Sequence, residues 1–320
     1  MTARSHCTSV SSLKLDSFRP DALDEAVRGG AIDHVQLTSG RFVGDLVHAD
    51  LGGRVLDYGA YNLPLLACGG MPADRIVLGF VTSEADVGHL NGTLVRGAAV
   101  VALAERSELH YRLAPHTRWM GFQVSRLTLE QTGVALRSAT TFPHLDAAQQ
   151  QRMQQTVDDA LETLHAMERG DPDILDATAA GLVVAETLTA AFAATLPAVD
   201  TTGGPEPGSL QRRLRLVKRT RDFFEGHLSQ PIQVTQVCEY VGASVRTLER
   251  AFVETYGANP KELLTLMRLA RARRALLAGR PDDTTVARIA ADSGCFHLGR
   301  FAASYTALYG EAPSATLKLR

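Results

Sequence analysis

The 320-residue sequence contains few of the patterns that mark a disulfide framework, a metal site or a nucleotide-binding site. Its four cysteines, Cys7, Cys68, Cys238 and Cys295, form no C-x-x-C pair, which argues against disulfides and against structural zinc. Neither a G-x-x-x-x-G-K-[ST] nor a G-x-G-x-x-G phosphate loop is present, so neither NTP hydrolysis nor a dinucleotide is indicated. We therefore expect a protein without cofactor or metal.

Membrane and export signals are also lacking. No apolar run approaches the about 20 residues that a membrane helix needs, and the N-terminus has no continuous apolar core of a secretory signal. The composition, with 45% hydrophobic and 21% charged residues, is that of an ordinary soluble protein. We expect a cytoplasmic protein without membrane contact.

Length and composition predict two domains joined by a linker. Single cores seldom grow past about 250 residues, and residues 197–209 are dense in Pro, Gly, Ser and Thr. The predicted division is therefore 1–196, a linker at 197–209, and 210–320. The last segment has 18 Lys and Arg against 10 Asp and Glu, whereas the rest of the chain has 15 against 25. A domain of net charge +8 beside one of −10 suggests that the C-terminal part faces a polyanion.

The N-terminal segment has the texture of strands followed by helices. Residues 35–124 form short Val- and Leu-rich runs broken by turn signals at Gly52-Gly53 and Asn91-Gly92, and residues 94–104 are predicted to be a buried strand pair. From Asp146 onward, two long Gly-poor segments flank Gly170-Asp171-Pro172. We predict a small β-barrel or sandwich with a trailing antiparallel helical pair. The pair either self-associates or closes the barrel within one subunit, and the sequence leaves both open.

The C-terminal domain contains one supersecondary unit twice. The offset between the copies is 52 residues up to a turn glycine, Gly242 or Gly294, and 53 beyond it. Matching pairs are Val237-Cys238 with Ile289-Ala290, Leu248 with Phe301, Phe252 with Tyr305, Tyr256 with Tyr309, Gly257 with Gly310, and Pro260 with Pro313.

In the first copy, two short helices are expected around Gly242, which permits a left-handed turn. Thr235 is predicted to cap the first helix and Ser244 the second. Leu248 and Phe252, four residues apart, anchor the second helix. That spacing leaves one opposite face, formed by Val245, Arg246, Glu249 and Arg250.

A helix held by one face and presenting arginine on the other suits the major groove, because arginine can hold guanine O6 and N7 bidentately. A solvated surface helix is the alternative. Arg246 and Arg250 would repel each other at the i,i+4 spacing, which favours the DNA interpretation. In the second copy Arg300 is the outstanding outward cation.

One long helix from Pro260 to Gly279 is predicted to connect the copies. It carries four arginines that either meet phosphates or form ordinary surface, namely Arg268, Arg271, Arg273 and Arg274.

Residues 213–320 resemble the AraC/XylS family of bacterial regulators, through VGASVRTLERAFVETYGANPKELL in the first unit and SGCFHLGRFAASYTALYGEAPSATL in the second. The resemblance implies an α+β protein with an N-terminal cupin-like β-barrel and a seven-helix DNA-binding domain of two helix-turn-helix units. It implies contacts to double-stranded DNA at Val245, Arg246, Glu249 and Arg250, and at Leu298, Gly299 and Arg300. Implied partners are a small-molecule effector, a second copy of the chain, and RNA polymerase if the protein is an activator.

The second unit departs from the family pattern. Ala303 stands where the family often has arginine, and Cys295 stands where an aromatic usually follows the turn glycine, with Phe296 as a substitute. We therefore expect the second unit to contribute less base-specific affinity.

Three alternative functions compete with this one. A cupin-type metal enzyme fused to a DNA-binding domain needs clustered His and carboxylate ligands, but the barrel region has no H-x-H and its histidines, His34, His48, His89, His110 and His116, are isolated. The related DNA-repair methyltransferases need a zinc-bound cysteine cluster, for which Cys7 and Cys68 are too few. The remaining alternative is a DNA-binding dimer without an effector.

Overall fold

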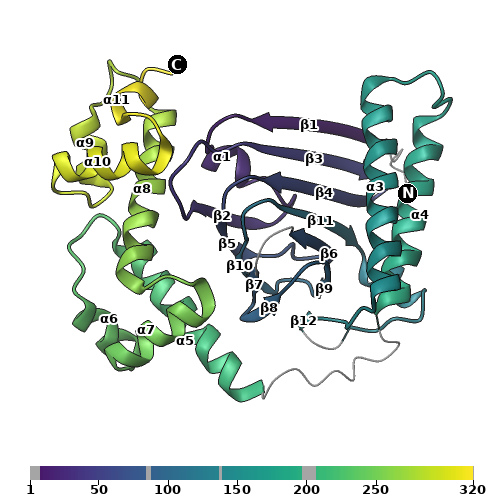
Figure 1. Cartoon of the computed structure of the whole chain (residues 1–320), viewed down its shortest axis with the longest axis horizontal. Coiled ribbons are helices and arrows are strands. Elements are labelled where there is room, and N and C mark those ends of the chain that lie inside the picture. Colours follow the sequence, from purple (N-terminus) through teal and green to yellow (C-terminus); the bar gives the residue numbers. More distant parts are fainter. Residues whose placement is uncertain (1–7, 84–87, 137–138, 197–206, 320) are drawn as a thin grey trace, which may run out of the picture.

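The computed structural model describes residues 8–83, 88–136, 139–196 and 207–319, and the chain is arranged in layers (Figure 1). Two antiparallel sheets form the N-terminal domain. The larger has, in order across the sheet, β1 (Ser9–Leu15), β3 (Gly44–Leu51), β4 (Arg54–Tyr61), β11 (Thr117–Val124), β6 (Ile76–Ser83), β9 (Ala99–Leu103) and β12 (Thr140–Thr141). The smaller has β2 (Ala31–Gln36), β5 (Leu65–Gly70), β10 (Glu108–Arg112), β7 (Gly88–Leu90) and β8 (Thr93–Val95).

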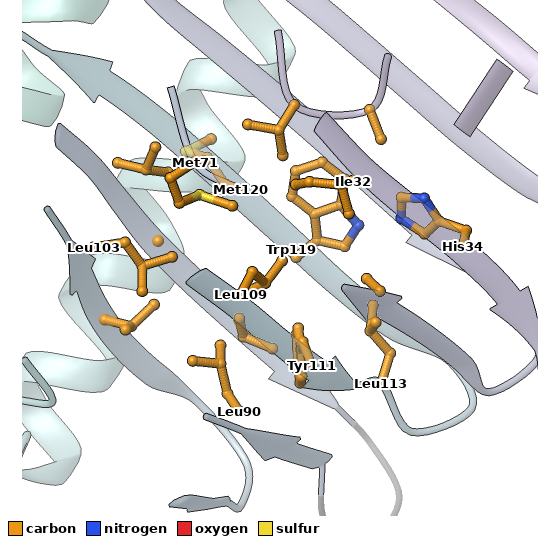
Figure 2. Close-up of a pocket in the computed structure, with 18 residues that line it drawn as sticks. Ile32, His34, Met71, Leu90, Leu103, Leu109, Tyr111, Leu113, Trp119 and Met120 are labelled. Atoms are coloured by element: carbon orange, nitrogen blue, oxygen red, sulfur yellow. The ribbon is translucent and has the colours of Figure 1, made fainter. Parts of the chain in front are cut away.

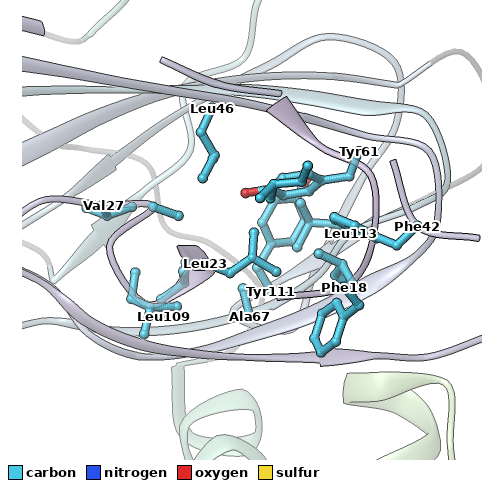
Figure 3. Close-up of a cluster of buried hydrophobic side chains, with 14 of the residues drawn as sticks. Phe18, Leu23, Val27, Phe42, Leu46, Tyr61, Ala67, Leu109, Tyr111 and Leu113 are labelled. Carbon is cyan, nitrogen blue, oxygen red and sulfur yellow. The ribbon is translucent and has the colours of Figure 1, made fainter. Parts of the chain in front are cut away.

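The two sheets face each other across an apolar interior. Figure 3 shows residues from both sheets, among them Leu46 and Tyr61 on one side and Ala67 and Leu109 on the other. Within the described part of the chain no strand of one sheet pairs with a strand of the other. The domain is therefore an open sandwich, and the predicted barrel is not closed.

Turn chemistry explains the hairpins. Gly52 and Gly53 have φ of 67° and 91° between β3 and β4, and Asn91 and Gly92 have φ of 47° and 76° between β7 and β8. Positive φ at both turn positions fits a two-residue hairpin. The strand pair predicted over residues 94–104 is wrong, because β8 pairs with β7 whereas β9 pairs with β6 and β12 in the other sheet.

The predicted helical pair is present and covers the outer face of the larger sheet. Helix α3 (Ala147–Arg169) begins at a capping box of Asp146 and Gln149 and ends at Gly170, with φ of 65°. Helix α4 (Ala177–Thr195) is capped by Asp176. Both pack against the sheet in one apolar cluster, with Phe192 stacked on Phe122 of β11 at 6.3 Å between ring centroids. Neither helix closes the end of the sandwich.

By length and composition alone, α4 is apolar enough to cross a membrane, so the expectation that no segment reaches this threshold is wrong. A third of its most apolar window is buried. Its inner face, with Val184, Leu188 and Phe192, packs within the protein. Leu182 and Val183 on its other side are 41% and 64% exposed.

The C-terminal helical domain lies against the smaller sheet, on the opposite side of the sandwich from α3 and α4 (Figure 1). Its helices are α5 (Pro207–His227), α6 (Val234–Val241), α7 (Val245–Tyr256), α8 (Pro260–Ala278), α9 (Val286–Asp292), α10 (Leu298–Tyr309) and α11 (Pro313–Thr316). Helix α5 begins inside the predicted linker, whose first ten residues, 197–206, lie outside the described part. Short helices α1 (Pro20–Leu23) and α2 (Arg126–Glu130) complete the fold.

Candidate DNA-binding surface

The first helix-turn-helix unit is formed by α6 and α7. Gly242 ends α6 with φ of 70°, a conformation that glycine adopts without steric cost. The Ser244 hydroxyl then accepts a hydrogen bond from the Thr247 N–H at 3.2 Å and starts α7. The predicted cap at Thr235 is wrong: α6 is capped at Gln233, two residues earlier, and the Gln233 N–H donates to the Gln236 side chain at 3.0 Å.

Helix α7 has the two faces that its sequence predicts. Leu248 and Phe252 are fully buried, in an apolar cluster with residues of α5 and α8. The opposite face is solvent-exposed and carries the predicted contact residues, Val245, Arg246, Glu249 and Arg250. The first unit thus presents two guanidinium groups on a helix that is anchored from behind.

Some charged side chains near this face form ion pairs with one another. Glu254, one turn beyond Arg250, lies 3.9 Å from the Arg250 Nε and 2.6 Å from Arg213 Nη1 of α5. Arg250 therefore has an i,i+4 partner in Glu254. The sequence argument considered only the repulsion between Arg246 and Arg250 and did not include this pair. At 72% side-chain exposure Arg250 is still accessible to a ligand from solvent. Among described residues Arg246 has no ion pair.

The second unit, α9 and α10, repeats the geometry with fewer cations. Thr285 caps α9, and Gly294 has φ of 78°. Leu298, Gly299 and Arg300 are exposed at the start of α10, and Ala303 is exposed one turn further along. The side chain that follows Cys295, Phe296, is 53% exposed.

Helix α8 connects the units from Pro260 to Ala278, as predicted, but most of its arginines serve the fold. Arg273 is fully buried and donates to Tyr305, Glu311 and the Phe18 carbonyl. Arg268 donates to the carbonyls of Leu228 and Gln230. Arg268 and Arg273 therefore bind groups within the protein, and the prediction that they contact phosphates is not supported. Of the four arginines, Arg271 is the one that is exposed and has no ion pair among the described residues.

The last tyrosine of each unit docks the unit onto the N-terminal domain. Tyr256 of α7 is buried, and its hydroxyl lies 2.9 Å from Nδ1 of His110 and accepts a hydrogen bond from Cys68 Sγ at 3.7 Å. Tyr309 of α10 stacks on Phe18 at 5.8 Å and lies under the Arg273 guanidinium at 4.5 Å.

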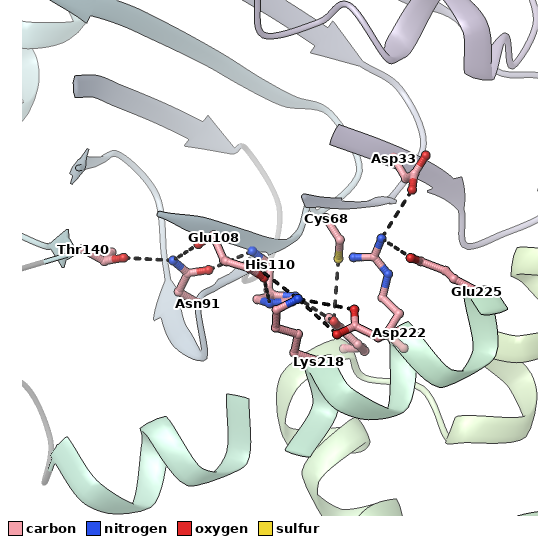
Figure 4. Close-up of polar contacts among 11 residues, drawn as sticks. Asp33, Cys68, Asn91, Glu108, His110, Thr140, Lys218, Asp222 and Glu225 are labelled. Carbon is pink, nitrogen blue, oxygen red and sulfur yellow. Dashed lines mark hydrogen bonds and ion pairs between the residues drawn. The ribbon is translucent and has the colours of Figure 1, made fainter. Parts of the chain in front are cut away.

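Polar side chains of the smaller sheet and of α5, among them Glu108, His110 and Lys218, meet at this interface (Figure 4). Lys218 of α5 pairs with Glu108 of β10 at 3.2 Å, and Arg221 lies 3.6 Å from Asp33 of β2. Burial lowers the pKa of His110, although the nearby carboxylates Glu108 and Asp222 oppose this shift. Ion pairs between the two domains thus lie beside the apolar cluster that joins the smaller sheet to the helices.

Two of the isolated histidines, His48 and His110, lie within hydrogen-bond distance of another side chain. His48 Nδ1 lies 2.7 Å from Asp57 Oδ1 in the sandwich, and His110 pairs with Tyr256. No group of three or more His, Cys, Asp or Glu side chains able to hold a metal ion occurs among the described residues.

Comparison with known proteins places the two units in a family. A family model described as a helix-turn-helix domain matches residues 237–319. A crystal structure described as a probable AraC family transcriptional regulator from Rhodopseudomonas palustris is 31% identical over 32% of this chain and 95% of that chain, with a TM-score of 0.31. The chain belongs to the AraC/XylS family.

Curated proteins match about a third of this chain. The probable thc operon regulatory protein of Rhodococcus erythropolis is 38% identical over 103 residues, which are 32% of this chain and 31% of that protein. The XylDLEGF operon transcriptional activator 3 of Pseudomonas putida is 34% identical over 103 residues, 32% of this chain and 31% of that protein. The match thus spans about a third of the length of these relatives.

Proposed function

We propose that the chain is a sequence-specific DNA-binding transcription regulator of bacteria, acting in the cytoplasm. The observation that carries the proposal is the outward face of α7: Arg246 and Arg250 are exposed on a helix whose other face is buried through Leu248 and Phe252. In this proposal both arginines contact base edges in the major groove, and Val245 and Glu249 contribute apolar and polar contacts beside them.

The second recognition helix, α10, contributes positioning more than base reading. Its N-terminal turn carries one cation, Arg300, beside Leu298 and Gly299, and Ala303 offers no hydrogen bond. A phosphate contact from Arg300 adds affinity on any sequence, because phosphates carry no sequence information. The two helices enter successive major-groove segments, held apart by α8.

The N-terminal domain, residues 1–196, acts as a cupin-like effector and dimerisation module, and residues 197–209 link it to the DNA-binding domain at 210–320. Supporting observations are the docked interface through Tyr256 and Tyr309 and the partly exposed Leu182 and Val183 on α4, which suit contact with a second copy. An effector that binds one domain arrangement better than another shifts the population between them.

The named roles of the curated relatives support a role in operon control. The Rhodococcus erythropolis protein is described as an operon regulatory protein and the Pseudomonas putida protein as a transcriptional activator. If this chain also activates transcription, RNA polymerase is a further partner.

Selection of duplexes from a random library, at fixed salt and with the full-length protein, tests the proposal. We expect enrichment of a two-box asymmetric site. The double variant Arg246→Ala, Arg250→Ala should lose enrichment of one box while its thermal unfolding stays unchanged, because both side chains are exposed.

Failure of both the full-length protein and the isolated span from Leu210 to enrich any sequence would contradict the proposal. Enrichment by the isolated span alone would show that the docked N-terminal domain masks DNA binding.

A further inference from the structure

A groove between α5 and α7 differs in size and charge from the cavity inside the sandwich. The interior cavity is about 60 Å³ in volume and is lined mainly by apolar side chains, beside His34, Gly79 and Gly121 (Figure 2). The groove between the two helices, called the α5–α7 groove below, is about 370 Å³ and is lined by charged and hydroxyl side chains as well as apolar ones. Of these two spaces, the groove is the one that suits a charged ligand.

The charge in the α5–α7 groove is mainly positive. Its charged lining residues in the described part of the chain are Arg212 and Arg213 of α5, and Arg250 and Glu254 of α7. Three guanidinium groups and one carboxylate give a net charge of +2. The carboxylate is already paired, because Glu254 lies 2.6 Å from Arg213 Nη1 and 3.9 Å from Arg250 Nε. An anion that enters the groove therefore meets an excess of positive charge.

Arg212 is the guanidinium best placed to bind such an anion. Arg213 donates to Glu254 and, through Nη2, to the Gly92 carbonyl of the β7–β8 turn at 3.5 Å, so its side chain is held at the interface with the sandwich. Arg212 is exposed and has no ion pair with any described residue. Its Nε donates to the Gly208 carbonyl of the same helix at 2.8 Å. Both Nη groups are therefore available for a charge-assisted contact with an anion.

Thr247 supplies a hydroxyl group on the α7 side of the groove. Its Oγ1 lies 2.9 Å from Ser244 Oγ, which also accepts a hydrogen bond from the Thr247 N–H. When Ser244 donates in the contact between the two hydroxyls, the Thr247 proton is free for an acceptor in the groove. Arginine and threonine side chains are both common donors to the phosphates of DNA.

The position of the groove beside α7 determines which anion it meets. An α-helix with its side chains is about 10–12 Å across, and the major groove of B-DNA is about 12 Å wide. When the outward face of α7 contacts base edges, the flanks of the helix therefore lie next to the sugar-phosphate backbones. Thr247, Arg250 and Glu254, at positions i, i+3 and i+7, form a row along the flank that faces α5.

The internal repeat identifies the same flank as the phosphate side of the second unit. Beyond the turn glycines the two units are offset by 53 residues, so Thr247 corresponds to Arg300. Arg300 is the residue for which a phosphate contact is proposed above. The second unit thus has its cation on the recognition helix itself. The first unit has a hydroxyl group at that position, and its cation, Arg212, comes from α5.

We propose that the α5–α7 groove binds one phosphate of the DNA backbone through the Arg212 guanidinium and the Thr247 hydroxyl. The proposal rests on the DNA binding proposed above and extends the interface from the recognition helix to α5. A phosphate contact adds affinity on any sequence and fixes the position of the protein on the duplex. Arg250 reads a base edge from the same side of α7.

Arg212→Ala and Arg215→Ala form a matched pair of variants. Both side chains are exposed, and both donate from Nε to the carbonyl four residues earlier in α5, at 2.8 and 3.3 Å. Of the two, Arg212 lines the groove and Arg215 does not. Each substitution removes one positive charge. Their comparison therefore separates a local phosphate contact from the general effect of charge.

Fluorescence anisotropy of the full-length protein on a selected and a scrambled duplex measures the affinity and its salt dependence. We expect Arg212→Ala to raise Kd about 5- to 10-fold at about 0.1 M salt and to reduce the salt slope by about 1 on both duplexes. Arg215→Ala should stay close to wild type in both quantities. Thr247→Val should raise Kd about 3-fold and leave the slope unchanged, because it removes no charge. Circular dichroism confirms that each variant is folded.

Neutral methylphosphonate groups, placed one at a time in the backbone at the edges of the first box, locate the contacted phosphate. We expect one position at which this replacement weakens binding of wild type about as much as Arg212→Ala does. The same replacement should have no further effect on Arg212→Ala, because the contact is already lost. It should still weaken binding of Arg215→Ala.

The inference is overturned if Arg212→Ala and Arg215→Ala behave alike, or if every methylphosphonate position keeps its effect in Arg212→Ala. It is also overturned if inorganic phosphate, titrated at constant ionic strength without DNA, binds saturably through Arg212 while the salt slope of DNA binding is unchanged in Arg212→Ala. The groove would then be a site for a free anion. Because a phosphate contact does not depend on sequence, the scrambled duplex tests this inference even when no site is selected. Failure of selection alone would defeat only the proposed sequence-specific function.

Discussion

The two helix-turn-helix units share their buried positions and differ where they face other surfaces. Leu248 and Phe252 in the first unit, and Phe301 and Tyr305 in the second, are all buried at equivalent positions. On the outer faces, two arginines in α7 correspond to one in α10. The contrast shows that packing within a unit fixes its apolar positions, whereas its outward residues adapt to what each unit touches.

Alanine substitution of the two turn glycines is expected to give the largest difference in the free energy of unfolding between the two units. A Cβ on Gly294 would lie 1.9 Å from the Leu228 carbonyl oxygen, whereas one on Gly242 would meet nothing within 4 Å. Gly242→Ala should cost about 1–2 kcal/mol from its positive φ alone. Gly294→Ala adds a backbone clash, so we expect about 3 kcal/mol or more. Urea denaturation of both variants measures the difference, and equal losses would show that the units are packed alike.

The arginines of the two recognition helices should contribute differently to DNA binding: those of α7 to sequence specificity, and that of α10 to affinity for any sequence. Replacing Arg246 and Arg250 by alanine should cost about 1–3 kcal/mol per lost base contact on the selected duplex and much less on a scrambled one. Arg300→Ala should weaken both duplexes about equally and reduce the salt slope by about 1. Fluorescence anisotropy at several salt concentrations gives both quantities. Loss of specificity in Arg300→Ala would reverse the assignment of roles.

Removing one hydroxyl from each docking tyrosine compares the two docking sites. Tyr256→Phe leaves His110 Nδ1 without its partner, and we expect a loss of about 1 kcal/mol in the free energy of unfolding. The Tyr309 hydroxyl is buried without a hydrogen-bond partner in the described residues, so Tyr309→Phe should be neutral or slightly stabilising. Thermal unfolding of both variants checks this, and a clear loss in Tyr309→Phe would contradict it.

Docking of the first unit should also depend on pH. Burial lowers the pKa of His110, against the pull of Glu108 and Asp222 and together with the repulsion of Lys218. As pH falls below the ordinary histidine value, the unfolded chain takes up the proton first, so the stability present above that value is progressively lost. His110→Gln should lose stability less steeply on acidification. A residual slope is expected from His34, whose pKa is lowered to about 4.

Local sequence signals predicted much of the helical domain. The turn at Gly242, the cap at Ser244 and the extent of α8 follow from local backbone chemistry and are confirmed. The cap was predicted two residues too late, at Thr235, because Gln233 and Gln236 form the capping box that begins the helix. Strand β1 was missed, since it pairs at the edge of the sheet and most of its side chains are exposed, so it lacks an apolar pattern.

Tertiary contacts explain what the sequence could not predict. Arg273 looks like a surface arginine in α8, but Tyr305, Glu311 and Phe18 come from elsewhere in the chain to surround it. The cavity beside His34 likewise depends on Gly79 and Gly121, more than 40 residues away in sequence. The outward face of α7 could be predicted because the i,i+4 spacing of Leu248 and Phe252 lies within one helix.

The central claim is that the first unit reads bases while the second mainly positions the domain. The most direct test measures binding of the wild-type protein to every single-base variant of its selected site at one salt concentration. We predict losses of about 1–3 kcal/mol per substituted position in one box, removed by Arg246→Ala with Arg250→Ala, and shallow losses in the other. Equal losses in both boxes, or losses that persist in the double variant, would contradict it.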